Sequence, residues 1–152
     1  MRLMRRSPAF GAKDAQTVKA FREAESYDGP SLIIAYGHCI AHGYDMARGI
    51  EHQRLAVDSG YWPLYRFDPR RAGQGEAPLV LDSAAPKTDV ADLMNVESRF
   101  QATAQHDAAG YAALVDRARE QIGKRLSLYG ELAKRPVCLK SQVSSLNVNV
   151  EP

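Results

Sequence analysis

Cysteine is scarce in this sequence of 152 residues, which contains only Cys39 and Cys138. The two lie far apart and form no CxxC pair, which excludes a disulfide framework and a paired-cysteine zinc or redox motif. Long apolar runs are also missing, since none approaches the ~20 residues that a membrane-spanning helix needs. The net charge of +2 shows no excess of one sign, so neither nucleic acid nor a membrane is expected as a partner. These absences favour a protein of a reducing, cytoplasmic setting.

The composition and length are those of one globular domain, with 45% hydrophobic and 25% charged residues. The clearest pattern is a helix that begins near Asp14, ends at a turn over residues 27–30 and precedes an apolar strand over residues 31–36. Helix, turn and strand form the second half of a βαβ unit, which predicts an α/β fold with a buried parallel strand. The strand expected before the helix falls on residues 5–8, where two arginines and Pro8 make a poor core strand.

Further elements follow with weaker patterns. Pro63 demotes the aromatic segment 61–67 to an edge strand or an extended segment, because proline cannot donate a ladder hydrogen bond. Apolar residues at steps of three and four, with polar residues on the opposite face, predict a long helix over residues 107–133. The remaining predictions are a helix over residues 46–59, a loop over 68–77, a short strand over 78–82, a helix over 90–101 and a patternless tail over 137–152.

Candidate reactive residues gather at the end of the apolar strand. The run over residues 32–35 stops at His38, Cys39 and His42, and Gly43 closes the cluster. Ligands and chemistry collect just past the carboxyl ends of strands in open α/β sheets. On the residues alone, three roles stay open for Cys39: a metal ligand together with the two histidines, a nucleophile with His42 as its base, or a small structural cysteine.

Other parts of the chain offer weaker candidates. His52 and His106 are too scattered in the sequence to complete a ligand set, and GxGxxG, Walker and HExxH motifs are absent. The aromatic segment 61–67 could stack nucleotide bases, but core or partner packing fits better because no basic stripe surrounds it. The residues alone therefore predict an α/β protein with a reactive cysteine at a strand end, without choosing its chemistry.

Five stretches of the chain resemble one known family. They are residues 10–19 (FGAKDAQTVK), 23–36 (EAESYDGPSLIIAY), 39–43 (CIAHG), 56–66 (AVDSGYWPLYR) and 81–83 (LDS). With them, residues 9 to about 133 resemble the extreme C-terminal part of pyruvate:ferredoxin (flavodoxin) oxidoreductase. The resemblance implies the C-terminal portion of a thiamine-diphosphate-binding fold over residues 9–67, a parallel sheet with flanking helices, and a mostly helical extension over residues 68–135. Residues 1–8 and 136–152 lie outside it.

The resemblance also implies an activity and its cofactors. Members of the family oxidatively decarboxylate pyruvate on thiamine diphosphate with magnesium, and they transfer the acetyl group to coenzyme A. Electrons pass through iron–sulfur clusters to ferredoxin or flavodoxin. The family's cysteine at the position of Cys39 is the fourth thiolate ligand of a four-iron four-sulfur cluster. The family's GDG-type thiamine and magnesium motif, and the other three ligands of that cluster, have no counterpart in this sequence.

The expected function is that of a C-terminal fragment of the oxidoreductase, from a truncated or split gene, with no catalytic residue of its own. Alone it is expected to be catalytically incompetent and to hold neither the cluster nor thiamine diphosphate. Its expected partners are the remainder of the polypeptide, ferredoxin or flavodoxin through the full enzyme, and a second copy in a homodimer. The alternative is a stand-alone metal-binding module that uses His38, Cys39 and His42.

Overall fold

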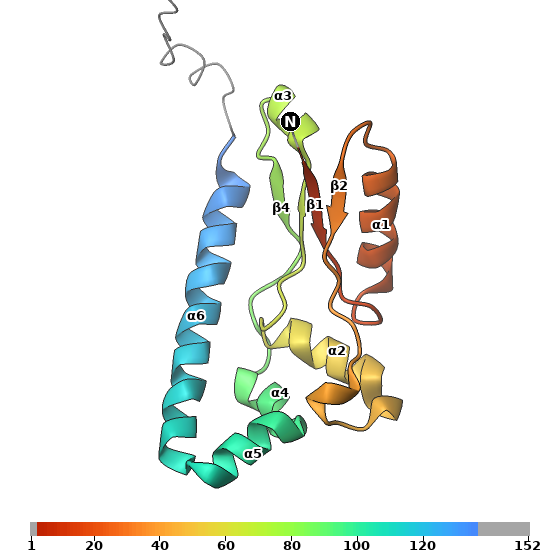
Figure 1. Cartoon of the computed structure of the whole chain (residues 1–152). Helices are drawn as coiled ribbons and strands as arrows, with labels where there is room; N and C mark the ends of the chain where they lie inside the picture. Colours follow the sequence, from red (N-terminus) through yellow and green to blue (C-terminus); the bar gives the residue numbers. More distant parts are fainter. Residues whose placement is uncertain (1–2, 137–152) are drawn as a thin grey trace, which may run out of the picture.

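A four-stranded sheet forms the centre of the molecule in the computed structural model, which describes residues 3–136 (Figure 1). Its strands are β1 (Met4–Ser7), β2 (Ser31–Ile33), β3 (Tyr65–Phe67) and β4 (Leu79–Leu81), in the order β2-β1-β3-β4. β1 runs parallel to β2, whereas the β1–β3 and β3–β4 pairs are antiparallel. The predicted α/β class is confirmed, but the sheet is mixed and not all parallel.

Helices flank the sheet and extend beyond one of its ends (Figure 1). α1 packs on β1 and β2, and α6 packs along β4. The helical elements are α1 (Asp14–Glu25), the 3-10 turns η1 (Ile40–His42) and η2 (Met46–Arg48), α2 (Gly49–Asp58), α3 (Pro69–Gly73), α4 (Val90–Val96), α5 (Ser98–His106) and α6 (Ala108–Lys134). The predicted helix over residues 46–59 is thus η2 followed by α2. No helix within residues 3–136 is both long and apolar enough to cross a lipid bilayer.

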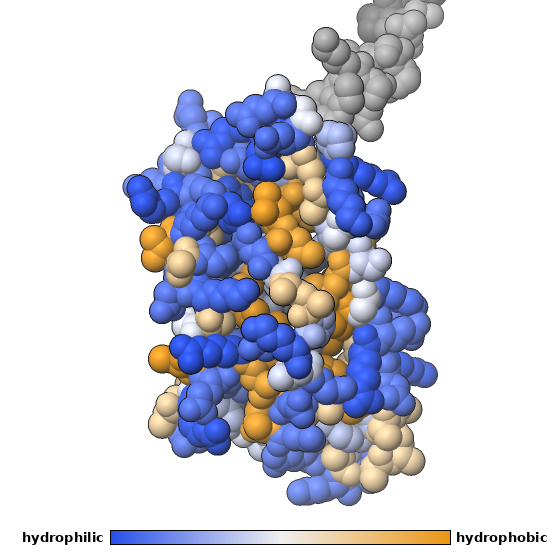
Figure 2. Space-filling model, turned by 180° about the vertical axis from the view of Figure 1, so that it is seen from behind, coloured by the Kyte–Doolittle hydropathy of each residue, from blue (hydrophilic) through white to orange (hydrophobic). Residues whose placement is uncertain are grey.

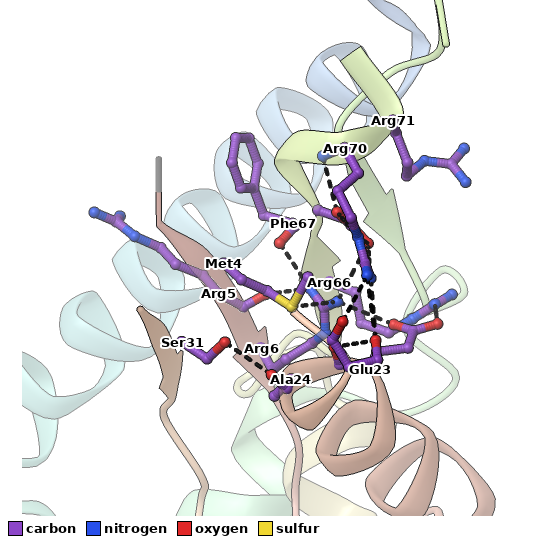
Figure 3. Close-up of polar contacts among 12 residues, drawn as sticks. Met4, Arg5, Arg6, Glu23, Ala24, Ser31, Arg66, Phe67, Arg70 and Arg71 are labelled. Atoms are coloured by element: carbon purple, nitrogen blue, oxygen red, sulfur yellow. Dashed lines mark hydrogen bonds and ion pairs between the residues drawn. The ribbon is translucent and has the colours of Figure 1, made fainter. Parts of the chain in front are cut away.

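The prediction of a poor core strand over residues 5–8 is wrong. β1 is an interior strand that pairs with β2 on one side and β3 on the other. The side chain of Arg6 is completely buried, and its charge is tolerated because two carboxylates lie near the guanidinium. One belongs to Glu23 (Figure 3) and the other to Asp68. Pro8 comes directly after the strand, where its missing N–H breaks no ladder hydrogen bond.

Two other strands occupy positions in the sheet that differ from the predicted ones. β2 forms an edge of the sheet, and Leu32 and Ile34 are 40% and 45% exposed, so the prediction of a buried strand is wrong although its parallel pairing is correct. β3 lies between β1 and β4 and not at an edge. Pro63 precedes β3, so the proline removes no hydrogen bond from the ladder. β4 confirms the short strand predicted over residues 78–82.

The C-terminal helices follow the predicted pattern except at Glu97. A carboxylate oxygen of Asp107 accepts a hydrogen bond from the N–H of Gly110 and caps α6, which confirms the long helix. The helix predicted over residues 90–101 is two helices, α4 and α5, because the backbone at Glu97 is extended and its side chain is buried. The loop predicted over residues 68–77 contains the short helix α3.

Two clusters of buried side chains hold these elements together. One consists of Ala9, Tyr36, Ala56, Val57, Leu64 and Leu93, with Trp62 packed against it. The other joins α4 to α6 through Val90, Met94, Val115 and Ile122. The indole N–H of Trp62 donates to the carbonyl of Pro8 over 3.0 Å, which ties the aromatic segment to the end of β1. The prediction that this segment packs in the core is confirmed.

Candidate functional site

Cys39 lies in the loop after β2, at the end of the sheet where the two parallel strands finish. An isolated parallel bridge between Ala9 and Tyr36 extends the pairing just beyond these strands. Cys39 follows in an extended conformation and precedes the turn η1, in which the N–H of His42 donates to the Cys39 carbonyl over 3.1 Å. The thiol is free, and the residue is exposed. This is the carboxyl-end position that the sequence predicts for it.

The loop that carries Cys39 is fixed at its far end by Gly43. The φ angle of Gly43 is 70°, a left-handed conformation that glycine adopts without a steric penalty. Its carbonyl accepts a hydrogen bond of 3.0 Å from the N–H of Ser98, the first residue of α5. A Cβ atom at position 43 would lie 1.7 Å from Ser98 Oγ. Glycine is therefore needed here, and it joins the Cys39 loop to the C-terminal helices.

A group of titratable side chains adjoins this loop. It includes His52, which was set aside as too scattered in the sequence to complete a ligand set, and Glu97, which sequence reasoning missed. His42, His52 and Glu97 each present a possible metal-ligand atom, and these atoms lie within 4.8 Å of one another. His52 and Glu97 are buried, and His52 Nε2 lies 2.7 Å from Glu97 Oε1. The other carboxylate oxygen of Glu97 pairs with the guanidinium of Arg99. His52 and Glu97 are 45 positions apart, so no local pattern in the sequence indicates their contact.

Aromatic rings enclose the two imidazoles of this group. Tyr44 stacks on His52 with ring centroids 3.8 Å apart, and Tyr36 stacks against both His42 and His52. Burial, with a smaller contribution from the positive charge of Arg99, lowers the pKa of His42. Burial also raises the pKa of Tyr36. Both side chains are therefore held in their neutral forms at neutral pH, which leaves a free lone pair on the His42 ring.

His38 is not part of this set of three ligand atoms, and it packs on α2 with its Nδ1 3.5 Å from the hydroxyl of Tyr44. A Cβ atom at Gly49 would lie 2.7 Å from the His38 ring, and His38 Nδ1 lies 3.4 Å from Nε2 of Gln53. Among residues 3–136, the ligand atoms of His38, Cys39 and His42 are not brought together as a set of three. The ligand set of the alternative metal-binding module is therefore not assembled in this structure.

Two further residues considered in the sequence lie elsewhere. His106 is the exposed last residue of α5. Cys138 lies outside the described residues.

Among the described residues, Cys39 can offer one thiolate to an iron–sulfur cluster, whereas a four-iron cluster needs four. The described residues fit a share of such a site and not a complete one.

Comparison with known proteins relates this chain to much larger enzymes, although no family model matches it. The chain is 52% identical over 127 residues, 84% of its length, to a pyruvate-flavodoxin oxidoreductase of Rhodospirillum rubrum. It is 45% identical over 129 residues, 85% of its length, to a pyruvate-flavodoxin oxidoreductase of a Nostoc species. It is 40% identical over 128 residues, 84% of its length, to the pyruvate:ferredoxin oxidoreductase of Moorella thermoacetica. In each case the chain spans 11% of the relative's length. The chain is therefore a homologue of one segment of the pyruvate-flavodoxin and pyruvate:ferredoxin oxidoreductases.

Proposed function

We propose that this chain contributes one segment of a pyruvate oxidoreductase and that Cys39 is one of four thiolate ligands of a four-iron four-sulfur cluster. In this proposal residues 9–67 close a thiamine-diphosphate-binding domain, and residues 68–135 form its helical extension. The observation that carries the proposal is the exposed, free thiol at the carboxyl end of the parallel strands β1 and β2. A ligand in that position can be shared with thiolates from other segments of a polypeptide, as a four-iron cluster requires.

The role of this chain is to present the Cys39 thiolate on a fixed loop. When bound, thiamine diphosphate supplies the decarboxylation of pyruvate, and the cluster supplies one-electron transfer toward ferredoxin or flavodoxin. The loop is held by the η1 turn on one side of Cys39 and by the hydrogen bond between Gly43 and Ser98. A ligand anchored in this way keeps the distance between an electron carrier and its donor constant, which electron transfer needs.

Apolar surface near Cys39 supports a larger polypeptide as the partner. Leu32 and Ile34 are exposed on the edge strand and just after it, and Ile40, next to Cys39, is 81% exposed. Phe10 and Phe21 stack on each other and are also exposed. Figure 2 shows hydrophobic surface along the middle of the reverse face, between hydrophilic side chains. The remaining oxidoreductase polypeptide would cover such surface. That polypeptide would also supply the thiamine motif and the other three cluster ligands, so we expect the isolated chain to show no pyruvate oxidation.

A chimaera tests the proposal. This chain replaces the matching segment of the Rhodospirillum rubrum enzyme, and Cys39→Ser is compared with Cys138→Ser as the matched cysteine control. We expect the chimaera and Cys138→Ser to reduce flavodoxin in the presence of pyruvate and coenzyme A. Cys39→Ser should lose that activity together with about four irons per chain. Full activity and iron content in Cys39→Ser would refute the assignment, and so would reconstitution of about four irons on the isolated chain.

A further inference from the structure

We propose that His42, His52 and Glu97 form a binding site for a divalent transition-metal ion, Zn²⁺ above all, that is separate from Cys39. The three residues come from η1, from α2 and from the junction of α4 and α5, and their ligand atoms lie within 4.8 Å of one another. Two imidazole nitrogens and one carboxylate oxygen are a set that zinc accepts, with a water completing the tetrahedron. An ion held here would link the Cys39 loop to both helical elements.

The hydrogen bonds in this group leave nitrogen atoms for an ion. His52 is 4% exposed, and its Nε2 pairs with Glu97 Oε1. Its Nδ1 and the Nδ1 of His42 are buried and have no hydrogen-bond partner among the described residues. A neutral imidazole has one donor and one acceptor nitrogen, so His42 keeps a lone pair that a cation can bind. Glu97 Oε1 accepts from His52 Nε2, so an ion that binds His52 at Nε2 must take the place of that proton, which is lost or moves to Nδ1. A buried polar atom without a partner costs free energy, and coordination at His42 Nδ1 would remove that cost for this atom.

The geometry needs only small movements to hold zinc. Tetrahedral coordination at the usual Zn–N and Zn–O lengths places the ligand atoms about 3.3 Å apart. The 2.7 Å contact between His52 and Glu97 would open slightly, and the other ligand atoms would close from their present separations of at most 4.8 Å. His42 lies on the three-residue turn η1 and is only partly buried, so its ring can make this adjustment.

The residues around the site determine its affinity for a metal ion, and its nitrogen ligands determine which ion it prefers. Arg99 pairs with Oε2 of Glu97, which leaves Oε1 on the side of the imidazoles. The positive charge of Arg99 opposes a cation and lowers its affinity. The rings of Tyr36 and Tyr44 stack against the imidazoles and limit access of water. Nitrogen ligands of this kind favour Zn²⁺ over Mg²⁺ or Ca²⁺, which prefer oxygen.

Metal titration of the whole chain tests the proposal. After EDTA treatment, calorimetric titration with Zn²⁺ should show saturable binding of about one ion per chain, and Zn²⁺ should raise the thermal midpoint of unfolding. Co²⁺ should give the visible bands of a tetrahedral nitrogen and oxygen site, without the near-ultraviolet thiolate charge-transfer band. Absence of saturable binding, or a thiolate band, would overturn the proposal.

Matched variants locate the ion. His42→Gln, His52→Gln and Glu97→Gln should each weaken Zn²⁺ binding by at least about tenfold, whereas His106→Gln and Cys39→Ser should leave it unchanged. His42→Gln lies on a partly exposed turn and is expected to fold even if a change at the buried pair does not; circular dichroism checks this. Binding that survives any folded variant of the three ligands, or is lost in Cys39→Ser, contradicts the site. None of these outcomes depends on whether Cys39 binds a cluster.

Discussion

Replacing Arg6 with methionine should lower the free energy of unfolding of the chain by about 3 kcal/mol. Arg6 is 0% exposed in the interior strand β1, and its Nη2 lies 3.1 Å from Glu23 Oε2 (Figure 3). The same atom lies 3.9 Å from Asp68 Oδ2. Its Nη1 donates to the carbonyl of Phe67 over 2.6 Å. Methionine is a flexible apolar side chain that can fill much of the same space, so the substitution mainly removes charge and hydrogen bonds.

The magnitude follows from what the substitution leaves behind. Removing one partner of a buried ion pair costs about 3–5 kcal/mol, because the other charge stays buried. Here Glu23 keeps a second partner, since Arg66 Nη1 lies 2.7 Å from its Oε1, and the side chains of Glu23 and Asp68 are 26% and 16% exposed. Burial disfavours the charged form of Arg6. It lowers the pKa of the guanidinium, although the carboxylates of Glu23 and Asp68 act in the opposite direction. These offsets place the expected loss at the lower end of the range.

Urea unfolding followed by far-ultraviolet circular dichroism measures the effect. Arg5→Met is the matched control, because Arg5 is the exposed neighbour on the same strand and its replacement should change stability by less than about 0.5 kcal/mol. A double variant that adds Glu23→Gln should lose less than the sum of the two single changes. Equal unfolding free energies for Arg6→Met and Arg5→Met would refute the reasoning, because the buried ion pairs would then contribute nothing.

Three further changes probe the sheet, the Cys39 loop and the acid range. Deleting residues 1–8 should abolish the cooperative thermal transition, because β1 pairs with strands on both sides; a retained transition in circular dichroism would contradict the fold. Gly43→Ala should cost about 1–3 kcal/mol in thermal unfolding, and more than Gly75→Ala, because both residues have positive φ but only position 43 lies against α5. Burial alone would raise the pKa of Asp68, but hydrogen bonds from Arg70 outweigh it and hold that pKa below its ordinary value. The unfolded state therefore binds this proton more readily, so the stability from Asp68 is complete above about pH 4 and declines at lower pH; Asp68→Asn should flatten the decline in an acid series of unfolding midpoints.

Local signals predicted the helices well. The helix over residues 107–133 follows from apolar spacing alone, and the structure adds a cap at Asp107 that needs only the N–H groups of the next turn. The break at Glu97 could not be predicted in this way, because Glu97 is held out of the helix by contacts that include His52 on α2. Tertiary contact overrides helical periodicity at this point, and one member of the candidate metal site is located there.

The interior position of β1 escaped prediction for a related reason. A charged side chain in a strand normally indicates an exposed face, and Arg6 breaks that rule only because Glu23 on α1 and Asp68 before α3 meet it inside the protein. Neither carboxylate is near Arg6 in sequence. The compensation could be predicted only from the fold that it helps to stabilise.

The apolar run over residues 32–35 shows a different limit of sequence reasoning. Hydrophobicity indicates that a surface needs to be covered, but it does not say which part of a protein covers it. Leu32 and Ile34 remain exposed here, and the chain spans 11% of the length of the relatives described above. The same distinction separates the two candidate sites. In the proposed function Cys39 is one ligand of a set that other chain segments must complete, so cluster binding can be shown only in the chimaera. His42, His52 and Glu97 all lie within the described residues, so the chain alone is sufficient to test whether they bind an ion.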